Sequence, residues 1–418
     1  MKALAPVKSV VYHSPSPKDV FAYSPGICAL DSGRLVATMD AGGPGVVRYF
    51  EKAVSSGGDF YECGQVFLSD DRGETWKKTA EFPYYHARPF AAGKSLYVLG
   101  HAGDLRIIRS DDGGETWSEP YFLTHGEAWH QAPANVWYAN GRVYLVMEKL
   151  SEEPRPGWPV SALLPVLLSA NVNDDLTRRE NWRFAEAKAF RDLMKEEETD
   201  YFGIPFYRTD PLEGAMIGGD RYCAPLGWLE TNVVQFTDPA HLWCDPSGHT
   251  FHLFMRAHTG RTGYAAMAKV TELPDGKTEF SLEKAPSGKT LLYLPMPGGQ
   301  MKFHILYDEK TALYWLLSTQ ATDSMIRPEA MPADRYNLPD NERQRLQLHF
   351  SKNCVDWCFA GLVDMGETTG QSRHYASMCI LGDDLYILSR SGDSEAATPH
   401  NTDMITLHEV KDFRTLVY

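Results

Sequence analysis

An eight-residue pattern with Ser, Asp, Gly, Thr and Trp at fixed places occurs twice in the chain. The first copy is SDDRGETW (residues 69–76), and the second, SDDGGETW (residues 110–117), begins 41 residues later. Asp and Gly suit a tight turn, because Asp bonds its own backbone and Gly accepts a positive φ. The Thr and Trp then begin a strand. A repeat of this length predicts a fold built from similar units of about 40 residues.

This octet resembles the Asp-box of the sialidase-like β-propellers, which joins the third and fourth strands of a blade. The resemblance implies an all-β fold, a six-bladed β-propeller, with residues 1–418 forming a single domain. In those proteins the Asp-box lies away from the active face. Two copies therefore favour a fold and say little about the chemistry.

Composition narrows the partners that the chain can have. The 418 residues are 43% hydrophobic, which is enough for a large core, and the formal net charge is −14. That charge argues against nucleic acid or an anionic membrane as the main partner. No apolar run approaches the roughly 20 residues of a membrane span.

The N-terminus, MKALAPVKSVVYHS, lacks the apolar core of a signal peptide, so we expect a cytoplasmic protein or a trimmed secreted or periplasmic one. The seven cysteines are an odd number without the paired spacing of a zinc site, which favours reduced thiols. No cofactor is predicted, and no metal ligands are assigned, because acidic positions alone are not evidence for a metal. The sequence does not indicate an oligomeric state.

Six hairpins of one design follow one another along the chain. Each has an apolar strand, a turn of Gly, Asp or Asn, and a second apolar strand. The second strands align without gaps as LVATMD (35–40), LYVLGH (96–101), VYLVME (143–148), FHLFMR (251–256), LYWLLS (313–318) and LYILSR (385–390). A third strand follows each hairpin, and KSVVYHS near the N-terminus is expected to close the ring. A degraded box, SKNCVDW (351–357), follows the fifth third strand, and residues 181–182 are expected to play that part in the third unit.

Two insertions interrupt the period, near residues 186–225 and 321–345. The first contains a helix-favouring stretch, EAKAFRDLMKEEE, and the second is rich in Pro, Met and charge. Loops of this length in a compact domain are often functional rims. Decoration or an oligomer contact is the alternative reading.

The sixth position of the aligned second strands is polar in every unit. Its members are Asp40, His101, Glu148, Arg256, Ser318 and Arg390. The starts of the innermost strands face the same mouth of the propeller and add Ser24, Arg88, His130, Glu230, Lys302, His304, His374 and Tyr375. A ring of polar groups above an apolar wall is typical of a small-molecule site. For any single member, a solvated strand end is the competing interpretation.

Three residues match the sialidase pattern. LETNVVQF and HLFMR place Glu230 and Arg256 where the family has a Glu and an Arg in its fourth blade, and HYASMCIL places Tyr375 where it has its nucleophilic Tyr. A phenol with a pKa near 10 needs an adjacent base to act as a nucleophile, and Glu230 would supply it. The general acid of the family lies after the second strand of blade one, where Asp40 and Asp59 are both candidates.

Other residues depart from that pattern. Sialidases clamp a carboxylate with three arginines, and this chain has YSPG (23–26) in place of the first. Arg390 stands where the family has a Glu that steadies that arginine, and Lys302 stands near the third arginine. Arg256, Lys302 and Arg390 would surround an anionic group in a different arrangement, because Lys lacks the bidentate fork of Arg. Hydrolysis of ordinary sialic acid is therefore not expected.

Further segments resemble a group of bacterial sialidase-like proteins known mainly by their fold. They are AWHQAP, GWLETNVV, MKFHILYDEKTALYWLLS and PHNTDMITLHEV. The resemblance implies that His130, Lys302, His400 and Asp403 belong to the active face. A histidine packed on Trp129, and a structural turn around His400, are the alternative interpretations.

These residues favour a carbohydrate-active enzyme, an exo-acting glycoside hydrolase that removes a terminal, acidic sugar from an oligosaccharide. Tyr375, Glu230 and one Asp would be catalytic, and Arg256, Lys302, Arg390, Arg88, His101, Glu148, His374 and His400 would bind the substrate. The first alternative is a lyase in which His130 or Tyr375 takes the proton next to a uronate carboxylate. A glycan-binding propeller without catalysis and a protein-binding scaffold are the others, because a fold does not determine a function.

Overall fold

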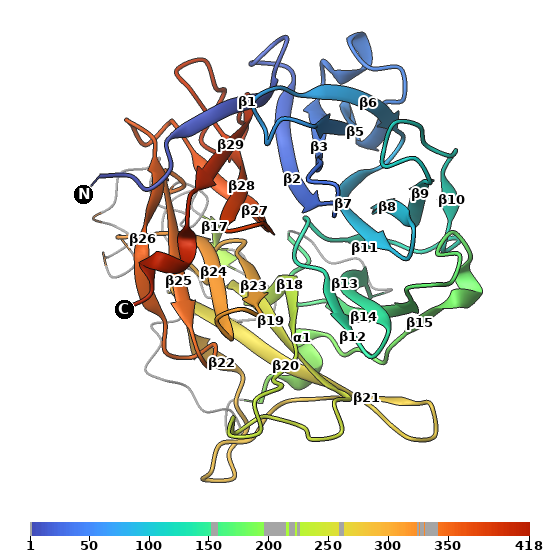
Figure 1. The fold of residues 1–418 in the computed structure, drawn as a ribbon, viewed down its shortest axis with the longest axis vertical. Coiled ribbons are helices and arrows are strands. Elements are labelled where there is room, and N and C mark those ends of the chain that lie inside the picture. The colour runs from blue at the N-terminus through green and yellow to red at the C-terminus, as the bar shows by residue number, and fades with distance from the viewer. Residues whose placement is uncertain are drawn as a thin grey trace.

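Six sheets surround a central axis, as the blades of a propeller do (Figure 1). The computed structural model describes residues 2–151, 158–195, 226–258, 263–323 and 342–418, with residues 326 and 330 and the backbone of 215–216 and 222–223. Each sheet has four or five strands, and all the pairings are antiparallel. The predicted six-bladed β-propeller is confirmed.

The strands of a blade follow one another from the axis outwards. The innermost are β2 (Phe21–Ala29), β7 (Tyr85–Ala92), β12 (Trp137–Ala139), β18 (Gly227–Val234), β23 (His304–Asp308) and β27 (Arg373–Leu381). The second are β3 (Leu35–Gly43), β8 (Ser95–Ala102), β13 (Arg142–Leu150), β19 (Thr250–His258), β24 (Leu313–Thr319) and β28 (Asp384–Ser391). Every second strand contains the segment expected from the aligned hairpins.

The third strands are β5 (Phe60–Ser69), β9 (Asp104–Ser110), β14 (Leu163–Asn171), β20 (Tyr264–Glu272), β25 (Arg345–Ser351) and β29 (Met404–Val410). The outer strands are β6 (Lys77–Phe82), β10 (Tyr121–Phe122), β15 (Trp182–Phe184), β21 (Thr278–Ser281), β26 (Cys358–Met365) and β1 (Val7–His13). Short additions are β4 (Val54–Gly57), β11 (Trp129–His130), β22 (Tyr293–Pro295), and the pair β16 (Ala215–Met216) and β17 (Tyr222–Cys223). We number the blades one to six by their innermost strands.

The ring is closed by the two ends of the chain. β1, from the N-terminus, pairs with β29, the last strand of blade six, from Val7 opposite His408 to His13 opposite Met404. This is the closure expected from KSVVYHS. It covers a sheet edge that would otherwise offer unpaired N–H and C=O groups to another chain.

Apolar side chains fill the space between the blades. Each second strand has a residue with no exposed surface in this layer: Val36, Leu99, Leu145, Leu253, Leu316 and Ile387. Burying one such side chain stabilises the fold by about 1.5–3 kcal/mol. Tyr144 stacks on Phe251 with ring centroids 4.1 Å apart, which joins blade three to blade four. The strands are apolar along most of their length because neighbouring blades cover both faces.

Two buried asparagines join the innermost strands across the axis. Asn135 donates to the carbonyls of Val233 (2.7 Å) and Ile305 (3.1 Å) and accepts from the Val233 N–H. Asn232 donates to the Phe303 carbonyl and accepts from the Ile305 N–H. These amides hold blades three, four and five in fixed relation just below the mouth of the propeller.

Both sequence octets form the predicted turn between a third and an outer strand. In the first, the Ser69 hydroxyl accepts from the Gly73 N–H (2.8 Å), and Asp71 accepts from the Thr75 N–H (2.9 Å) and hydroxyl (2.5 Å). The second repeats these bonds from Ser110 to Thr116. SKNCVDW forms a related turn, in which Asn353 takes the place of the Asp. Residues 181–182 come at the start of β15, as expected.

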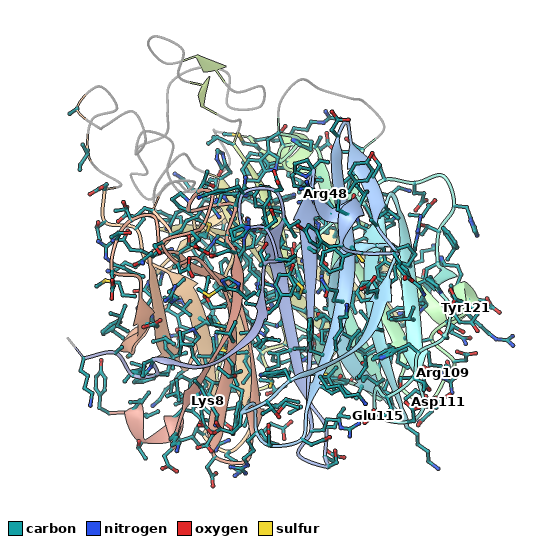
Figure 2. All side chains as sticks on the ribbon, turned by 90° about the horizontal axis from the view of Figure 1, so that it is seen from above. Lys8, Arg48, Arg109, Asp111, Glu115 and Tyr121 are labelled. Atoms are coloured by element: carbon teal, nitrogen blue, oxygen red, sulfur yellow. The ribbon has the colours of Figure 1, made fainter. Side chains whose placement is uncertain are left out.

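The octet turns lie at one end of the propeller. Figure 2 shows Asp111 and Glu115 of the second octet at the end that also carries Lys8, whereas Arg48 is at the other end. Arg48 lies on the short 3₁₀ helix η1 (Val46–Arg48), which follows the end of β3. The mouth formed by the ends of the second strands is therefore remote from the octets.

The predicted insertions lie largely outside the described residues. The helix-favouring stretch of the first shows one turn of helix, α1 (Phe190–Leu193), within the part that is described. Two more 3₁₀ turns are η2 (Arg179–Asn181) and η5 (Phe413–Leu416). Six cysteines in the described residues are free thiols, and no helix there is long and apolar enough to span a membrane.

Candidate functional site

Four innermost strands carry the same irregularity where they reach the mouth. β2, β7, β18 and β27 each contain a β-bulge, and at each bulge one residue other than Gly has a left-handed backbone. These residues are Ser24 (φ 48°), His86 (φ 52°), Glu230 (φ 58°) and Tyr375 (φ 49°). This conformation is costly for a residue with a Cβ and often marks a functional site. The bulges give four different side chains one common orientation at the mouth.

The register brings the two predicted sets of residues together. Asp40 pairs with Tyr23, His101 with Tyr85, Arg256 with Leu229 and Arg390 with His374. In each case the partner is the residue immediately before the left-handed one. In blade three, Glu148 pairs with His130. The polar strand ends and the bulges therefore form two adjoining rings at one mouth.

Arg256 connects Glu230 of blade four to Tyr375 of blade six. Its Nη1 donates to the Tyr375 hydroxyl (2.7 Å) and lies 3.3 Å and 3.5 Å from the two carboxylate oxygens of Glu230. Its Nε donates to the carbonyl of Gln300 (2.9 Å). The negative charge of Glu230 also acts on the Tyr375 phenol and raises its pKa. A phenol, a carboxylate and a guanidinium thus form one buried cluster, which the sequence predicts as a catalytic pair with an arginine beside it.

Burial raises the pKa of Tyr375, against the opposing effect of Arg256. The phenol is therefore protonated at neutral pH and would need a base to become a nucleophile. Two further guanidinium groups lie near its ring, Arg390 at 5.2 Å and Arg343 at 5.5 Å from the centroid. Arg390 also lies 4.0 Å from the ring centroid of Tyr23. The tyrosine thus has cations on several sides.

Two buried carboxyl groups of blade one complete this part of the mouth. Asp40 is 1% exposed; one of its oxygens accepts from the backbone N–H of His86 (2.7 Å), and the other has no partner among the described residues. Burial, and then the charge of Glu62, raise the pKa of Asp40 well above its ordinary value. Burial also raises the pKa of Glu62 to about 8, although Arg390 opposes this effect. Both groups are therefore held in the protonated form that a general acid requires.

The other acid candidate, Asp59, is in a different environment. It is exposed on the turn between β4 and β5. Glu148, by contrast, is fully buried at the mouth and accepts from the Thr231 N–H (3.1 Å) and hydroxyl (2.7 Å). Burial raises the pKa of Glu148 to about 8. Of the two Asp candidates, only Asp40 shares the buried environment of Glu230 and Tyr375.

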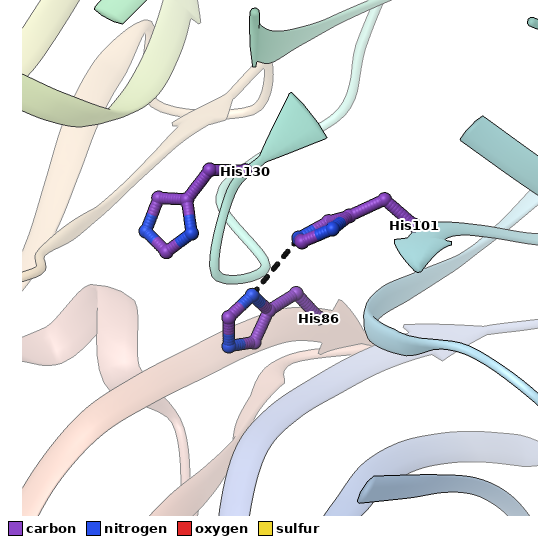
Figure 3. Close-up of side chains that lie close together, drawn as sticks. All are labelled: His86, His101 and His130. Carbon is purple, nitrogen blue, oxygen red and sulfur yellow. Dashed lines mark hydrogen bonds between the residues drawn. The ribbon is translucent and has the colours of Figure 1, made fainter. Parts of the chain in front are cut away.

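Three histidines of blades two and three meet beside this cluster (Figure 3). The Nδ1 of His86 and the Nε2 of His101 are 3.0 Å apart, and the ring of His130 completes the group. Burial lowers the pKa of all three, and Glu230 opposes this effect at His130. These imidazoles are therefore neutral at neutral pH. His101 and His130 are predicted site residues, whereas His86 is not.

Lys302 and Arg88 face protein atoms. The Lys302 ammonium donates to the carbonyls of Tyr375 (3.2 Å) and Ala376 (2.6 Å) and to the Ser377 hydroxyl (3.0 Å), so it holds the bulge that carries Tyr375. Arg88 donates to the carbonyls of Asn135 and Val146. It lies two residues beyond the bulge, and it lines a cavity of about 320 Å³ in the half of the tunnel away from the mouth. The predicted substrate contacts of Lys302 and Arg88 remain predictions that these contacts do not support.

The remaining predicted residues lie around Arg390. The Nη2 of Arg390 donates to the carbonyl of His400, which is exposed, and lies 3.3 Å from its Nδ1. His374 is buried, with its Nδ1 3.0 Å from the Nη1 of Arg343. Asp403 accepts from the Asp393 N–H and lies 3.9 Å from the Nε2 of His13. His374 and His400 thus flank the arginines, while Asp403 lies in a neighbouring group.

Sequence reasoning missed His86, Glu62 and Arg343. For His86 a signal was available, because the strands YSPGIC, YHARPF, LETNVV and HYASMC align at their bulges and place His86 at the position of Glu230 and Tyr375. That alignment puts Arg88 opposite Asn232 and Ser377, deeper in the tunnel. Glu62 is a single charge within a buried strand, and Arg343 lies in an insertion, so neither has a repeating neighbour to compare.

Comparison with known proteins matches the repeats and the fold. The BNR/Asp-box repeat model matches residues 67–78 and 108–119. Among curated proteins, the vacuolar protein sorting/targeting protein 10 of Colletotrichum graminicola is 34% identical over 91 residues, and that of Neurospora crassa is 34% identical over 73 residues. These matches cover 22% and 17% of this chain and only 5% and 4% of those proteins.

Solved structures match nearly the whole chain. A Hadza microbial sialidase has a TM-score of 0.54 at 15% identity, covering 96% of this chain and 68% of its own. A Penicillium chrysogenum α-L-arabinanase complexed with arabinobiose has a TM-score of 0.51 at 11% identity, covering 99% of both chains. A mutant Trypanosoma rangeli sialidase with trans-sialidase activity has a TM-score of 0.52 at 13% identity, covering 98% of this chain and 59% of its own. The match over nearly the whole chain establishes a sialidase-like propeller fold, which glycoside hydrolases also use. At identities this low, the comparison shows the fold alone.

Proposed function

We propose that this chain, two BNR/Asp-box repeats on a sialidase-like six-bladed propeller, is a glycoside hydrolase that removes a terminal sugar from an oligosaccharide or glycan. The observation that carries the proposal is the hydrogen-bonded cluster of Glu230, Arg256 and Tyr375. Binding alone would not need a phenol and a carboxylate joined through one buried arginine. A nucleophile with an adjacent base is the arrangement that covalent catalysis requires.

In this mechanism the Tyr375 oxygen attacks the anomeric carbon while its proton passes to Glu230. The bond from that carbon to the leaving oxygen breaks, and the leaving oxygen takes a proton from a carboxylic acid. Arg256, which donates to the phenol oxygen, stabilises the negative charge that develops there. Water then attacks the anomeric carbon and gives a proton to the carboxylate of the former acid. The bond to the Tyr375 oxygen breaks, and that oxygen takes its proton back from Glu230.

We assign the acid to Asp40. Its pKa is raised by burial and by Glu62, so the group holds a proton at the pH where Tyr375 must lose one. Its position is held by the His86 N–H, which comes from the bulge of the neighbouring blade. Asp59 remains the second candidate for the acid, and it is exposed.

The charges of the site favour an acidic sugar, such as a uronic or ulosonic acid. With Asp40 and Glu62 protonated, Arg256, Arg343 and Arg390 outnumber the carboxylates that face Tyr375. Glu230 is 2% and Tyr375 9% exposed, which suits the end of a glycan better than an internal residue. The α-L-arabinanase and an α-L-arabinofuranosidase of Fusarium graminearum, each with arabinobiose, make neutral furanosides the first comparison substrates.

A lyase is the second candidate, favoured by the neutral imidazole of His130. That ring is half-buried, desolvation lowers its pKa, and the charge of Glu230 opposes this effect. A neutral imidazole suits a base that takes the proton beside a uronate carboxylate, and the guanidinium groups would neutralise that carboxylate. Elimination leaves a carbon–carbon double bond in the product, which hydrolysis does not.

A panel of terminal uronic, ulosonic and neutral glycosides tests the proposal, with reducing sugar and ultraviolet absorbance followed together. Release of sugar without new absorbance supports a hydrolase. Release with absorbance that His130→Ala abolishes would replace it with the lyase. Glycan binding without any product would replace both with a binding module.

A further inference from the structure

Three imidazoles from two neighbouring blades converge at the mouth. His86 lies at the bulge of β7, His101 at the end of β8, and His130 on β11 of the next blade. In the described residues, one ring nitrogen from each lies within 4.8 Å of one ring nitrogen of the other two. Figure 3 shows the three rings turned toward a common centre. The bulge provides this geometry, because His86 would otherwise follow the regular alternation of its strand.

The spacing of the rings fits a shared metal ion. Three imidazoles bound through nitrogen at 2.0–2.1 Å to one tetrahedral ion have ring centroids about 5.2 Å apart. The observed separations are 5.1 Å for His86 and His101, 5.2 Å for His86 and His130, and 5.9 Å for His101 and His130. The rings are mutually tilted by 56° to 87°, so none stacks flat on another. Only the third separation needs a small rotation to close.

The contacts around the trio keep the rings in place. Tyr85 packs against His86 and His101, with centroids 5.1 Å and 4.8 Å away. The His86 and His101 nitrogens that face each other at 3.0 Å share one proton, which a metal ion would displace. His101 is 2% exposed, and its Nδ1 has no hydrogen-bond partner among the described residues. A buried imidazole with a hydrogen bond to only one other imidazole is poorly satisfied as a structural group alone.

We propose that His86, His101 and His130 form a binding site for one divalent transition-metal ion, of which Zn²⁺ is the representative. Imidazole nitrogens suit zinc and its neighbours, whereas Mg²⁺ and Ca²⁺ prefer oxygen ligands. Three protein ligands leave a coordination position for water or for a sugar oxygen. The site lies between Asp40, which accepts from the His86 N–H, and Glu230, whose charge acts on His130. An ion bound here would use the nitrogen lone pair of His130, so His130 could not act as the base of the lyase mechanism.

Metal binding to the full-length protein tests the site without any substrate, so its failure is separate from failure of the proposed function. The protein is stripped with a chelator and titrated with Zn²⁺ against a chromophoric competitor. We expect one tight equivalent, a visible absorption band with Co²⁺ of the intensity typical of four- or five-coordinate nitrogen sites, and no competition from Mg²⁺ or Ca²⁺. His86→Ala and His101→Ala are each expected to weaken Zn²⁺ binding by about 100-fold.

His13→Ala is the matched control. His13 belongs to the other group of possible ligands in the described residues, with Asp393 and Asp403, but it offers one exposed imidazole. Its loss is expected to leave the tight equivalent unchanged. Zn²⁺ is expected to raise the melting temperature of the wild type and of His13→Ala, but not that of the folded His86 and His101 variants. Absence of a stoichiometric equivalent, or an equivalent that persists in both variants, would overturn the proposal.

Discussion

The carboxyl groups of the octet turns and those of the mouth are in opposite states, although both lie at sharp irregularities of the backbone. Asp71 is exposed and accepts three hydrogen bonds from its own turn, led by the Thr75 hydroxyl, which lower its pKa to about 2. Asp40 and Glu62 are buried, each has an oxygen without a partner among the described residues, and burial raises the pKa of both. Asp71 is therefore an anion whose oxygens are fully hydrogen-bonded, whereas Asp40 and Glu62 are carboxylic acids that retain their protons.

This difference separates the residues that build the fold from those that can do chemistry. A carboxylate whose lone pairs are saturated by its own turn stabilises that turn and has little left for a substrate. A buried, protonated and incompletely bonded carboxyl is costly to the fold, and such groups concentrate at functional sites. The most recognisable motif of the sequence is therefore the one with the least direct bearing on activity.

The largest effect is expected from Glu230→Gln, which removes the base while keeping the shape of the side chain. We expect kcat to fall by about 10³-fold, because general base catalysis of this kind contributes 10²–10⁴. Glu283→Gln is the control in the same blade, since Glu283 bonds His252 and Lys269 away from the mouth. Equal losses in the two variants would show that the effect is not specific to the mouth.

Asp40→Asn tests which Asp is the acid. We expect a fall in kcat of about 10²-fold for an alkyl leaving group, and a much smaller fall for an activated aryl leaving group that needs no proton. Asp59→Asn is expected to behave as the wild type with both substrates. The reverse pattern would assign the acid to Asp59 on the exposed β4–β5 turn, and a buried, protonated carboxyl would then not mark the reacting acid.

Asp71→Ala and Asp112→Ala test the other side of the comparison. Each removes the acceptor that closes an octet turn, so we expect the melting temperature to fall by about 2–4 °C. Because these turns are at the end away from the mouth, kcat/KM at 25 °C is expected to stay within about twofold. A large loss of activity in folded protein would contradict the structural role given to the octets.

A further expected effect, on stability and not on activity, is a pH dependence of the free energy of unfolding. The folded protein keeps the proton of Glu62 up to about pH 8, whereas the unfolded chain releases it near the ordinary value of 4.5. Between these values the folded state binds more protons, so the free energy of unfolding falls as pH rises, by up to about 1.4 kcal/mol per pH unit for this group. Glu62→Gln is expected to flatten the slope in denaturant titrations from pH 5 to pH 8. An unchanged slope would mean that Glu62 titrates normally.

The fold was readable from the sequence because its signals are local. The turn residues, the aligned second strands and the two octets each specify a short piece of a blade, and repetition supplies the rest. The sequence predicts Glu230, Arg256 and Tyr375 as site residues because their positions in the repeat match a known pattern. His101 and Arg390 were found because they end a strand at an equivalent place.

The bulges could not be read in the same way. A Gly in a sequence indicates that a left-handed backbone is allowed at its position. Ser24, His86, Glu230 and Tyr375 give no such indication, because their conformation is imposed by the neighbouring blades. Asp40 and Asp59 differ in burial, which only the assembled ring determines and on which the proposed acid depends. The sequence could not predict the contacts of Lys302 either, because its acceptors are backbone carbonyls 73 and 74 residues away in the chain.

The central claim is that Tyr375 is the reacting group of the mouth, and a comparison of two tyrosines of blade six tests it most directly. Tyr386 donates to the carboxylate of Glu409 (2.7 Å), but it lies near the start of β28, whereas the mouth is at the other end of that strand. With a substrate identified by the panel, we predict that Tyr375→Phe lowers kcat by at least about 10³-fold and that Tyr386→Phe leaves it unchanged. The melting temperature of Tyr375→Phe should stay near that of the wild type. Activity of Tyr375→Phe within tenfold of the wild type would contradict the account.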